Sequence, residues 1–472
     1  MTLPPKFAEF RMFRRDITLF SPAGEGILLH KIPGRVMTLP YKYRKFHTEG
    51  RGNRPSLADF HHILGELTMK LITGGVCAAK GFKANGIHCG IRKNHSKKDL
   101  ALIVSDVPAS AAAVYTTNLV KGAPLTVTKN NIANGIARAV ICNSGNANTC
   151  NANGIEIAEG MCALVEQHTG VAANDVVVAS TGVIGQPLDL TPIAKGMEEL
   201  VSGLSVPGAA DAAMAIMTTD TIPKEVAVEF EVGGKVCRMG GIAKGSGMIH
   251  PNMATMLVFI TTDCAISPEM LNLALKGDVP NTFNMTSVDG DTSTNDMVSV
   301  LANGLAGNEP ITGKGADFDT FMKALNTITV HLCRLIAGDG EGATKLLECT
   351  ATGADTLDAA KISAKSVITS SLFKAAMFGA DANWGRVLCA IGYSGADVDV
   401  SKIGVSFRSN KGVVTVCKNG SGILFSEELA KEVLLEKEIE ILVSLGDGPY
   451  AATAWGCDLT YDYVKINGDY RT

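Results

Sequence analysis

From about residue 70 onward, the hydrophobic positions fall into short apolar runs separated by polar turns that contain glycine. The runs at 101–104, 138–142 and 176–179 have the length and the β-branched content of buried strands. Alanine-rich stretches with helical spacing, such as 155–168, alternate with them. This alternation predicts layers of helices packed on sheets.

The second half of the chain continues the same alternation. An apolar run at 256–260 predicts a strand, and helices are expected at 268–276 and 318–337. The segment 436–467 is predicted to form strands, whereas 203–208 and 306–317 have the composition of surface connections. No apolar run approaches the roughly 18 residues that span a bilayer, so no membrane segment is expected.

Polar loops follow two of the predicted strands directly. The strand 138–142 leads into 143–149, and the strand 176–179 leads into 180–185. A third polar run, 287–296, contains five Ser, Thr or Asn residues and three aspartates. Loops that leave strand ends are where α/β proteins build their sites, so the two loops 143–149 and 180–185 are candidates for one.

The composition is that of a globular enzyme of ordinary size. The chain has 472 residues, 46% of them hydrophobic and 19% charged, with 50 glycines. This length predicts two domains, and we expect a layered α/β sandwich. The predicted boundaries are 1–68, 69–254 and 255–472, the last two being the α/β domains.

The first 68 residues differ from the rest of the chain. Residues 1–70 carry 12 Lys and Arg against 6 Asp and Glu, so the remainder is acidic. Positive charge suits a transit peptide or a nucleic-acid-binding arm, but acidic residues and frequent prolines interrupt this one. We expect a poorly ordered leader or a mis-assigned start, with Met69 as the alternative first residue. A cytoplasmic protein is expected, and organellar targeting is the alternative.

Cysteine and histidine spacing points to no metal site. The 12 cysteines include no Cys-x-x-Cys pair, and the 9 histidines include no His-Glu-x-x-His motif. We expect reduced cysteines in the core and no bound metal. The run Gly338-Asp-Gly-Glu-Gly342 superficially suggests phosphate binding, but no strand leads into it and no Gly-Lys-Ser/Thr follows. A nucleotide cofactor is therefore not expected.

Thr255 is the most informative single residue. A glycine-containing segment, 244–254, delivers it to the start of the apolar run 256–260. A threonine hydroxyl is a weak nucleophile, but cutting the Ala254-Thr255 bond places a free α-amine of pKa about 8 beside it as a base. Ordinary strand threonines are far more common, so the context has to decide.

Four other residues supply the remaining parts of an acyl-transfer site. Thr181 and Gly182 offer a hydroxyl and an accessible backbone N–H for an oxyanion. Lys244, in a glycine-rich loop that we expect to be mobile, is a cation for a substrate carboxylate, and Glu341 is a carboxylate for a substrate ammonium or a proton. Taken singly, each is more commonly a turn residue or a solvated loop charge.

The stretch from Lys244 to Asp263 resembles the self-processing segment of the ornithine acetyltransferase family, also called glutamate N-acetyltransferase. The resemblance recurs in order along roughly 70–472, so chance similarity is very improbable. The further stretches that carry it are Thr117-Asn118, 142–148, 180–185, 217–221, 287–295, 338–342, Asp381-Ala-Asn-Trp-Gly-Arg386 and the extreme C-terminus.

The resemblance implies an N-terminal-nucleophile type of enzyme that cuts itself between Ala254 and Thr255. Thr255 then carries acetyl from N2-acetyl-L-ornithine to L-glutamate, in the cyclic pathway of arginine biosynthesis. Carried over by position, Thr181 and Gly182 form the oxyanion pair. The substrate-binding set is Thr218, Lys244, Thr255, Glu341, Asn467 and Thr472, with Thr219 as an alternative to Thr218.

The same resemblance implies associated α and β chains, which we expect as a heterotetramer of two α and two β, without nucleic-acid or membrane partners. No cofactor is expected, although acetyl-CoA is a candidate co-substrate that would make the enzyme also an amino-acid N-acetyltransferase. The alternative enzyme class is an N-terminal-threonine aminopeptidase or amidase, in which water resolves the acyl-enzyme. A regulatory α/β module without activity is the non-enzymatic alternative, and it predicts an intact chain.

Overall fold

The computed structural model describes residues 10–13, 16–20, 26–30, 69–250 and 256–468. The chain divides into two units, 1–63 and 64–472. In the first unit, three antiparallel strands form a small sheet in the order β1-β2-β3: β1 (Phe10–Phe13), β2 (Asp16–Phe20) and β3 (Gly26–His30). The assignment of 1–68 as a leader stays a prediction.

A large mixed sheet organises the first part of the second unit. Its strand order is β4-β9-β10-β11-β12-β6-β7-β8, and β5 also pairs with β6. The β11–β12 and β7–β8 pairs are parallel and the others are antiparallel. The strands are β4 (Lys70–Ile72), β5 (Phe82–Ile87), β6 (Leu100–Tyr115), β7 (Ile136–Asn146), β8 (Val176–Val183), β9 (Lys224–Val232), β10 (Lys235–Lys244), β11 (Leu257–Thr262) and β12 (Met297–Ala302).

A second, smaller sheet is built from the C-terminal part of the chain. Its order is β16-β15-β14-β17-β13-β18, with the β13–β17 pair parallel. The strands are β13 (Leu346–Ala354), β14 (Gly404–Ser409), β15 (Gly412–Lys418), β16 (Ser421–Gly422), β17 (Glu438–Ser444) and β18 (Tyr450–Cys457).

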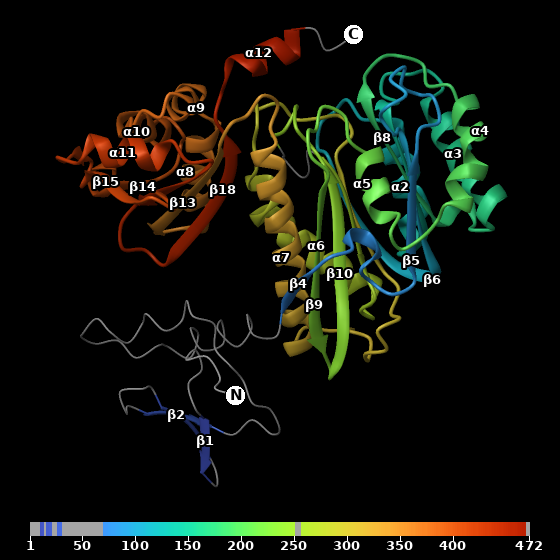
Figure 1. Ribbon diagram of the computed structural model, residues 1–472, viewed down its shortest axis with the longest axis horizontal. Helices are drawn as coiled ribbons and strands as arrows, with labels where there is room; N and C mark the ends of the chain where they lie inside the picture. The colour runs from blue at the N-terminus through green and yellow to red at the C-terminus, as the bar shows by residue number, and fades with distance from the viewer. Residues whose placement is uncertain (1–9, 14–15, 21–25, 31–68, 251–255, 469–472) are drawn as a thin grey trace, which may run out of the picture. The chain divides into compact units, whose positions relative to one another are not determined.

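Helices cover both sheets, and α7 (Ala316–Gly338) lies between them (Figure 1). Its apolar residues recur every three or four positions, so one face of the helix is buried. The other helices are α2 (Ala123–Asn131), α3 (Gly154–Thr169), α4 (Thr191–Ser202), α5 (Ala209–Ala215), α6 (Pro268–Asp278), α8 (Leu357–Thr369), α9 (Ser371–Phe378), α10 (Trp384–Gly392), α11 (Glu427–Leu434) and α12 (Tyr461–Gly468).

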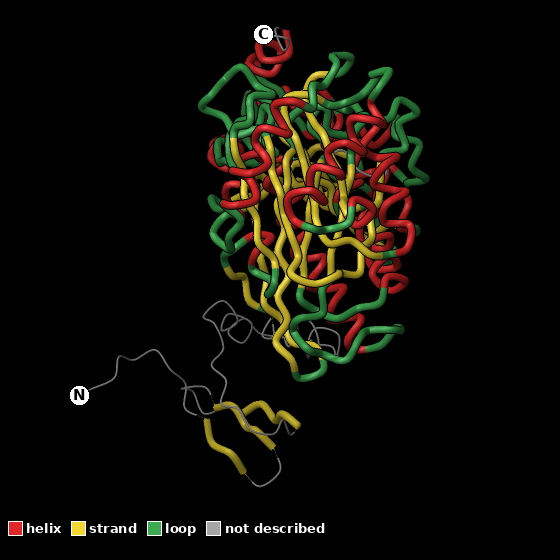
Figure 2. The backbone as a smooth tube through the Cα atoms, turned by 90° about the vertical axis from the view of Figure 1, so that its right-hand side faces the viewer, coloured by secondary structure: helices red, strands yellow, loops and turns green. Residues whose placement is uncertain are grey.

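Strand β11 is buried on both faces, which explains its uninterrupted apolar sequence. Val258 and Ile260 belong to the core cluster that contains α7, whereas Leu257 and Phe259 belong to a second cluster with α5. Side chains that alternate between two cores must all be apolar. Figure 2 shows the long strands of the large sheet running side by side with helices beside them.

The predicted elements are largely confirmed, but three differ. The strands predicted at 138–142 and 176–179 continue through Asn146 and Val183, so much of the predicted polar loops is strand. The segment 436–467, predicted as strands, ends in helix α12. The Thr460 hydroxyl accepts the N–H of Tyr463 at 3.4 Å and Asp462 lies in the first turn, and both favour a helix start there.

The predicted cut between 254 and 255 falls between two adjacent strands of one sheet. Strands β10 and β11 pair antiparallel from Met239–Thr262 to Lys244–Leu257. Pieces 69–254 and 255–472 therefore both contribute to the large sheet. Its backbone hydrogen bonds join them whether or not the connecting peptide is intact.

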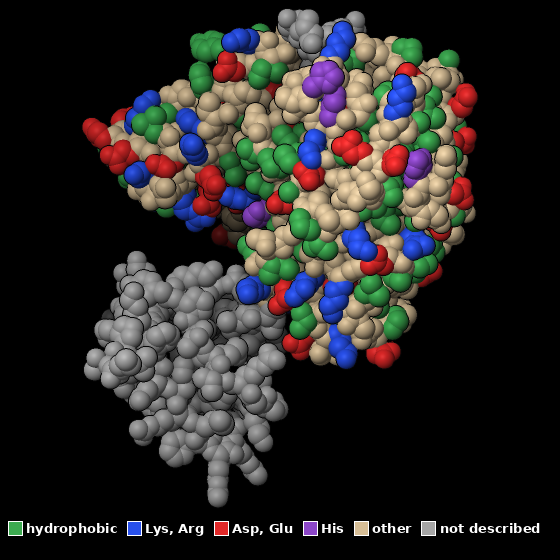
Figure 3. Space-filling model, turned by 45° about the vertical axis from the view of Figure 1, so that its right-hand side comes forward, with side chains coloured by type: hydrophobic (Ala, Val, Ile, Leu, Met, Phe, Trp, Pro, Cys, Tyr) green, Lys and Arg blue, Asp and Glu red, His purple; other side chains and the backbone are tan. Residues whose placement is uncertain are grey.

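Within the described ranges, no helix is long and apolar enough to cross a bilayer. All 12 cysteines are free, and most are buried, as expected from their spacing. On the face drawn in Figure 3, positive and negative side chains are interspersed rather than gathered by sign.

Candidate active site

The ends of β7 and β8 place Thr181 and Gly182 at one edge of the large sheet. In the parallel register, Ser144 lies opposite Thr181 and Gly145 lies opposite Gly182. Thr181 is buried. Both residues are thus fixed by the sheet rather than by a free loop, which is a more rigid support for an oxyanion site than the predicted loop.

Gly182 occupies a position that only glycine fits. Its φ is +131°, and a Cβ atom there would lie 2.3 Å from the carbonyl carbon of Gly145 and 2.5 Å from the nitrogen of Asn146. Contacts with backbone atoms cannot be relieved by a side-chain rotation. The close approach of β7 and β8 at this edge therefore requires a glycine at 182.

Replacing Gly182 by alanine is expected to lower the rate of the predicted acyl transfer by about 10² to 10³-fold, because the added Cβ displaces the strand end whose N–H is the predicted oxyanion donor. Steady-state kinetics measures the loss. The matched control is Gly185→Ala, which also has a positive φ, of +76°, but meets no atom within 4 Å. An equal loss in both variants would mean that backbone strain, and not the close approach, is responsible.

Lys244 is the last residue of β10 and not part of a mobile loop, so that expectation is wrong. Ile242 and Ala243 carry the strand up to it, and it pairs with Leu257, two residues beyond Thr255. The side chain is only 8% exposed. No described carboxylate forms an ion pair with its ammonium, although Asp220 and Asp296 lie close enough to interact electrostatically with it. A buried cation of this kind is available for a substrate anion.

A buried ion network holds the segment that contains Thr218. The ammonium of Lys224 lies 2.7 Å from an oxygen of Asp220 and 2.5 Å from an oxygen of Asp339. Asp220 also accepts the N–H of Thr218 at 2.9 Å and the N–H of Gly245 at 2.7 Å. Burial opposes ionisation of Asp220, but the two lysine ammonium groups and these hydrogen bonds hold its pKa well below its usual range. The segment around Thr218 is thereby tied to the end of β10.

Glu341 is also buried, at 7% exposure, and is not a solvated loop charge. Its N–H donates to the carbonyl of Ser246 at 3.0 Å, and its carboxylate accepts from the amide of Asn467 at 2.7 Å. A Cβ atom on Gly247 would lie 2.3 Å from this carboxylate, so glycine permits the close approach. The structure thus brings together Glu341 and Asn467, two of the residues predicted to bind substrate.

Sequence reasoning missed Asn295 and Asp296, which come directly before β12. The amide of Asn295 donates to the carbonyls of Ala147 and Ser180, at 2.6 and 3.0 Å, so it links the β7 and β8 ends. Asp296 is 2% exposed, one of its oxygens has no hydrogen-bond partner among the described residues, and burial raises its pKa well above the usual range. The sequence signal that could have identified them is the presence of two polar residues directly before a strand in which every residue is buried.

Three predicted site residues, Ala254, Thr255 and Thr472, lie outside the described residues. Their roles stay predictions. Of the two alternatives Thr218 and Thr219, both are half-buried, and the N–H of Thr218 is bonded to Asp220.

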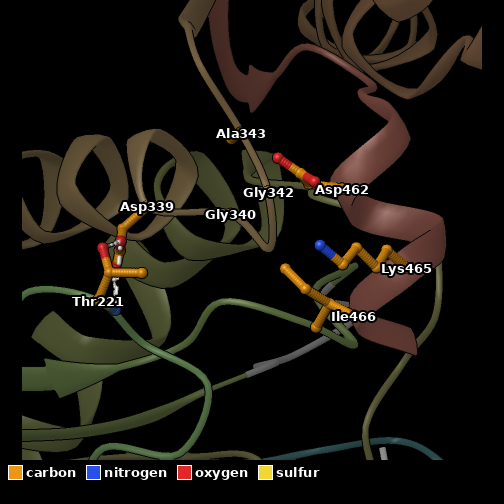
Figure 4. A pocket seen from close by; sticks show the side chains of 8 residues that line it. All are labelled: Thr221, Asp339, Gly340, Gly342, Ala343, Asp462, Lys465 and Ile466. Atoms are coloured by element: carbon orange, nitrogen blue, oxygen red, sulfur yellow. Dashed lines mark hydrogen bonds between the residues drawn. The ribbon is translucent and has the colours of Figure 1, made fainter. Parts of the chain in front are cut away.

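An open cavity of about 450 Å³ adjoins the Gly338–Gly342 segment (Figure 4). Asp462, Lys465 and Ile466 reach it from α12, and the hydrogen-bonded pair Thr221 and Asp339 lies on the other side. Neither Lys244 nor Thr181 lines it. The cavity is next to the predicted substrate residues rather than centred on them. Within the described ranges, no group of His, Cys, Asp and Glu side chains is arranged to hold a metal ion.

Comparisons with known proteins match most of the chain to members of one family. The model of the ArgJ family matches residues 83–472. The arginine biosynthesis bifunctional protein ArgJ of Caldanaerobacter subterraneus subsp. tengcongensis is 52% identical over 405 residues, 86% of this chain and 100% of that protein. ArgJ 1 of Clostridium acetobutylicum is 50% identical over 392 residues, 83% of this chain and 96% of that protein. A crystal structure of ornithine acetyltransferase complexed with ornithine, from Mycobacterium tuberculosis, is 37% identical, with a TM-score of 0.36, and covers 40% of this chain and 100% of that one.

Proposed function

The chain belongs to the ArgJ family, and we propose that it transfers acetyl from N2-acetyl-L-ornithine to L-glutamate. It is an acyltransferase of arginine biosynthesis. The observation that carries the substrate assignment is the pair Lys244 and Glu341, two buried groups of opposite charge. The backbone N–H of Glu341 bonds to Ser246, two residues beyond Lys244 and the end of β10. An amino acid offers an anion and a cation of its own, so one such site accepts ornithine and glutamate derivatives in turn.

In this proposal, the chain first activates itself. The Thr255 hydroxyl attacks the carbonyl of Ala254, the peptide nitrogen leaves as the amine of Thr255, and water then hydrolyses the resulting ester. Ala254 becomes a C-terminal carboxylate, and Thr255 gains a free α-amine. An α-amine has an ordinary pKa of about 8, so this one takes the hydroxyl proton in the later reaction. The paired strands β10 and β11 keep the two chains together.

The acetyl group then moves in two steps. The Thr255 oxygen attacks the acetyl carbonyl of N2-acetylornithine, and the hydroxyl of Thr181 and the N–H of Gly182 stabilise the oxyanion. The tetrahedral intermediate collapses, ornithine leaves with the proton held by the α-amine, and Thr255 retains the acetyl as an ester. The amine of glutamate attacks this ester and loses a proton to the α-amine. The bond between the acetyl carbon and the Thr255 oxygen then breaks, that oxygen takes the proton from the α-amine, and N-acetylglutamate departs.

Two kinetic tests address this proposal. Initial rates at several fixed glutamate concentrations should give parallel double-reciprocal lines, because ornithine leaves before glutamate reacts. Release of ornithine without glutamate should be at least about tenfold slower than with it. Intersecting lines, or full ornithine release with water alone, would point instead to a ternary complex or to the aminopeptidase or amidase alternative.

The relatives are named bifunctional proteins, which supports a second activity for this chain. We propose acetyl-CoA as a second acetyl donor to the same Thr255, with N-acetylglutamate as the product. Incubation of the purified protein with acetyl-CoA and glutamate tests this directly. Assembly as two α and two β chains, and the cytoplasm as the compartment, remain our expectations.

A further inference from the structure

The predicted processing segment is held on both sides by one loop. The segment 287–297, which leads into strand β12, forms hydrogen bonds with the backbone at 248–250 and at 256. These two stretches flank residues 251–255, which lie outside the described residues and contain Ala254 and Thr255. On the C-terminal side, the N–H of Met297 donates to the carbonyl of Met256 at 2.9 Å. Both flanks are therefore fixed to the same piece of chain.

The contacts on the N-terminal side are more numerous. The two oxygens of Asp289 accept the N–H groups of Met248 and Ile249, at 2.6 and 2.9 Å. The carbonyl of Ile249 accepts from the N–H of Val288 at 2.7 Å and from the hydroxyl of Ser287 at 3.1 Å. The N–H of Met248 and both backbone polar groups of Ile249 therefore bond to residues 287–289.

His250, the next residue in the chain, also forms hydrogen bonds with the segment 287–292. The hydroxyl of Thr292 donates to the carbonyl of His250 at 2.8 Å, and the ring Nδ1 of His250 lies 3.0 Å from the hydroxyl of Ser287. Burial, with the ammonium of Lys365 nearby, lowers the pKa of His250 to about 4, so the ring is neutral near pH 7. The hold on this flank does not depend on a charged histidine.

Asp289 binds a stretch of backbone, 248–249, whose conformation is unfavourable in itself. Met248 has a φ of +56°, which is unfavourable for a residue with a Cβ. A carboxylate that accepts both N–H groups at 248 and 249 compensates for such a conformation. The phenol of Tyr463 on α12 also faces Asp289 and Glu341, whose charges add to burial in raising its pKa.

We propose that Asp289 is a positioning residue for self-processing, and that with Thr292 it fixes the backbone before the scissile bond for attack by Thr255. This inference rests on the proposed cleavage between Ala254 and Thr255. Its action is geometric: a reacting group held within a narrow range of positions gains orders of magnitude in rate. The clamp formed by 287–292 then remains on the new C-terminal segment after the cut.

The test uses the full chain made by cell-free synthesis, with the loss of the uncut chain followed on denaturing gels. Asp289→Asn is expected to slow cleavage at least tenfold, because an amide nitrogen cannot accept one of the two N–H bonds. Thr292→Val is expected to slow it about threefold and serves if Asp289→Asn fails to fold.

The matched control is Asp278→Asn in α6. Asp278 is a buried carboxyl, whereas Asp289 is half-buried. Asp278 accepts from the hydroxyl of Thr282 at 3.0 Å and from the amide of Asn326 at 2.8 Å, and burial raises its pKa as it does that of Asp289. None of these contacts involves 246–256. In the uncleavable Thr255→Ala background, both asparagine variants are expected to lower the unfolding midpoint to a similar extent.

Cleavage of Asp278→Asn within about twofold of the wild-type rate, with slow cleavage of Asp289→Asn, supports the inference. Equal slowing in both variants would overturn it, because lost stability alone would then explain the effect. Wild-type cleavage with an unaffected Asp289→Asn variant overturns the clamp but leaves the proposed function intact. A wild-type chain that stays uncut overturns both.

Discussion

Replacement of Thr255 by alanine is expected to leave one uncut chain and to lower acetyl transfer by at least about 10⁴-fold, the scale of loss seen when an enzyme's nucleophile is removed. Both effects follow from the loss of one hydroxyl. Without it, the Ala254 carbonyl is not attacked, no α-amine is released and no acetyl ester can form. Denaturing electrophoresis and an assay of ornithine release measure the two effects on the same preparation.

The matched variant is Thr255→Ser, which keeps a hydroxyl and loses only a methyl group. It is expected to cut itself and to retain part of the activity. If Thr255→Ala is cut and active like the wild type, Thr255 is neither the processing group nor the nucleophile. If Thr255→Ser behaves like Thr255→Ala, the hydroxyl is not the property that matters.

Replacement of Lys224 by methionine is expected to lower the free energy of unfolding by about 3 to 5 kcal/mol. The ammonium of Lys224 is fully buried between Asp220 and Asp339, so its removal leaves two carboxylates without their counter-ion in the interior. Denaturant unfolding monitored by fluorescence measures the change. A loss below about 1 kcal/mol would show that the network contributes no more than an exposed ion pair.

The combined variant with Asp220→Asn and Asp339→Asn provides the control, because it removes the unpaired charges along with the lysine. It should recover much of the lost stability.

The low folded-state pKa of Asp220 also determines how the free energy of unfolding depends on pH. The ionised carboxylate stabilises the fold above its unfolded pKa of about 4, and this contribution is lost as pH falls toward the lower folded pKa. The wild type should therefore lose more stability than Lys224→Met when the pH falls below about 4.

The sequence pattern predicts the α/β layers and most element positions because apolar periodicity reports burial directly. The helix predicted at 318–337 is found as α7, and the apolar run at 256–260 lies almost entirely in β11. The extent of the strands at the site is not predictable in this way. Residues 143–146 and 180–182 are polar or small, yet pairing with a neighbouring strand keeps them in the sheet.

The burial of Lys244 and Glu341, two residues of the candidate site, is likewise not predictable from local sequence. Glycines follow Lys244 and surround Glu341, so local composition predicts exposed loops for both. Their burial comes from contacts distant in sequence, such as those of Ser246 with Asp339 and of Asn467 with Glu341. The family resemblance identified the two residues, but only the fold explains why their charges are held away from water.

Intact-mass spectrometry of an active preparation decides whether the active protein has been cut by its own threonine. Two polypeptides that remain associated under native conditions are expected, the smaller one spanning 255–472 and beginning Thr-Met-Leu-Val. A fully active preparation that consists of one unbroken chain would contradict this expectation.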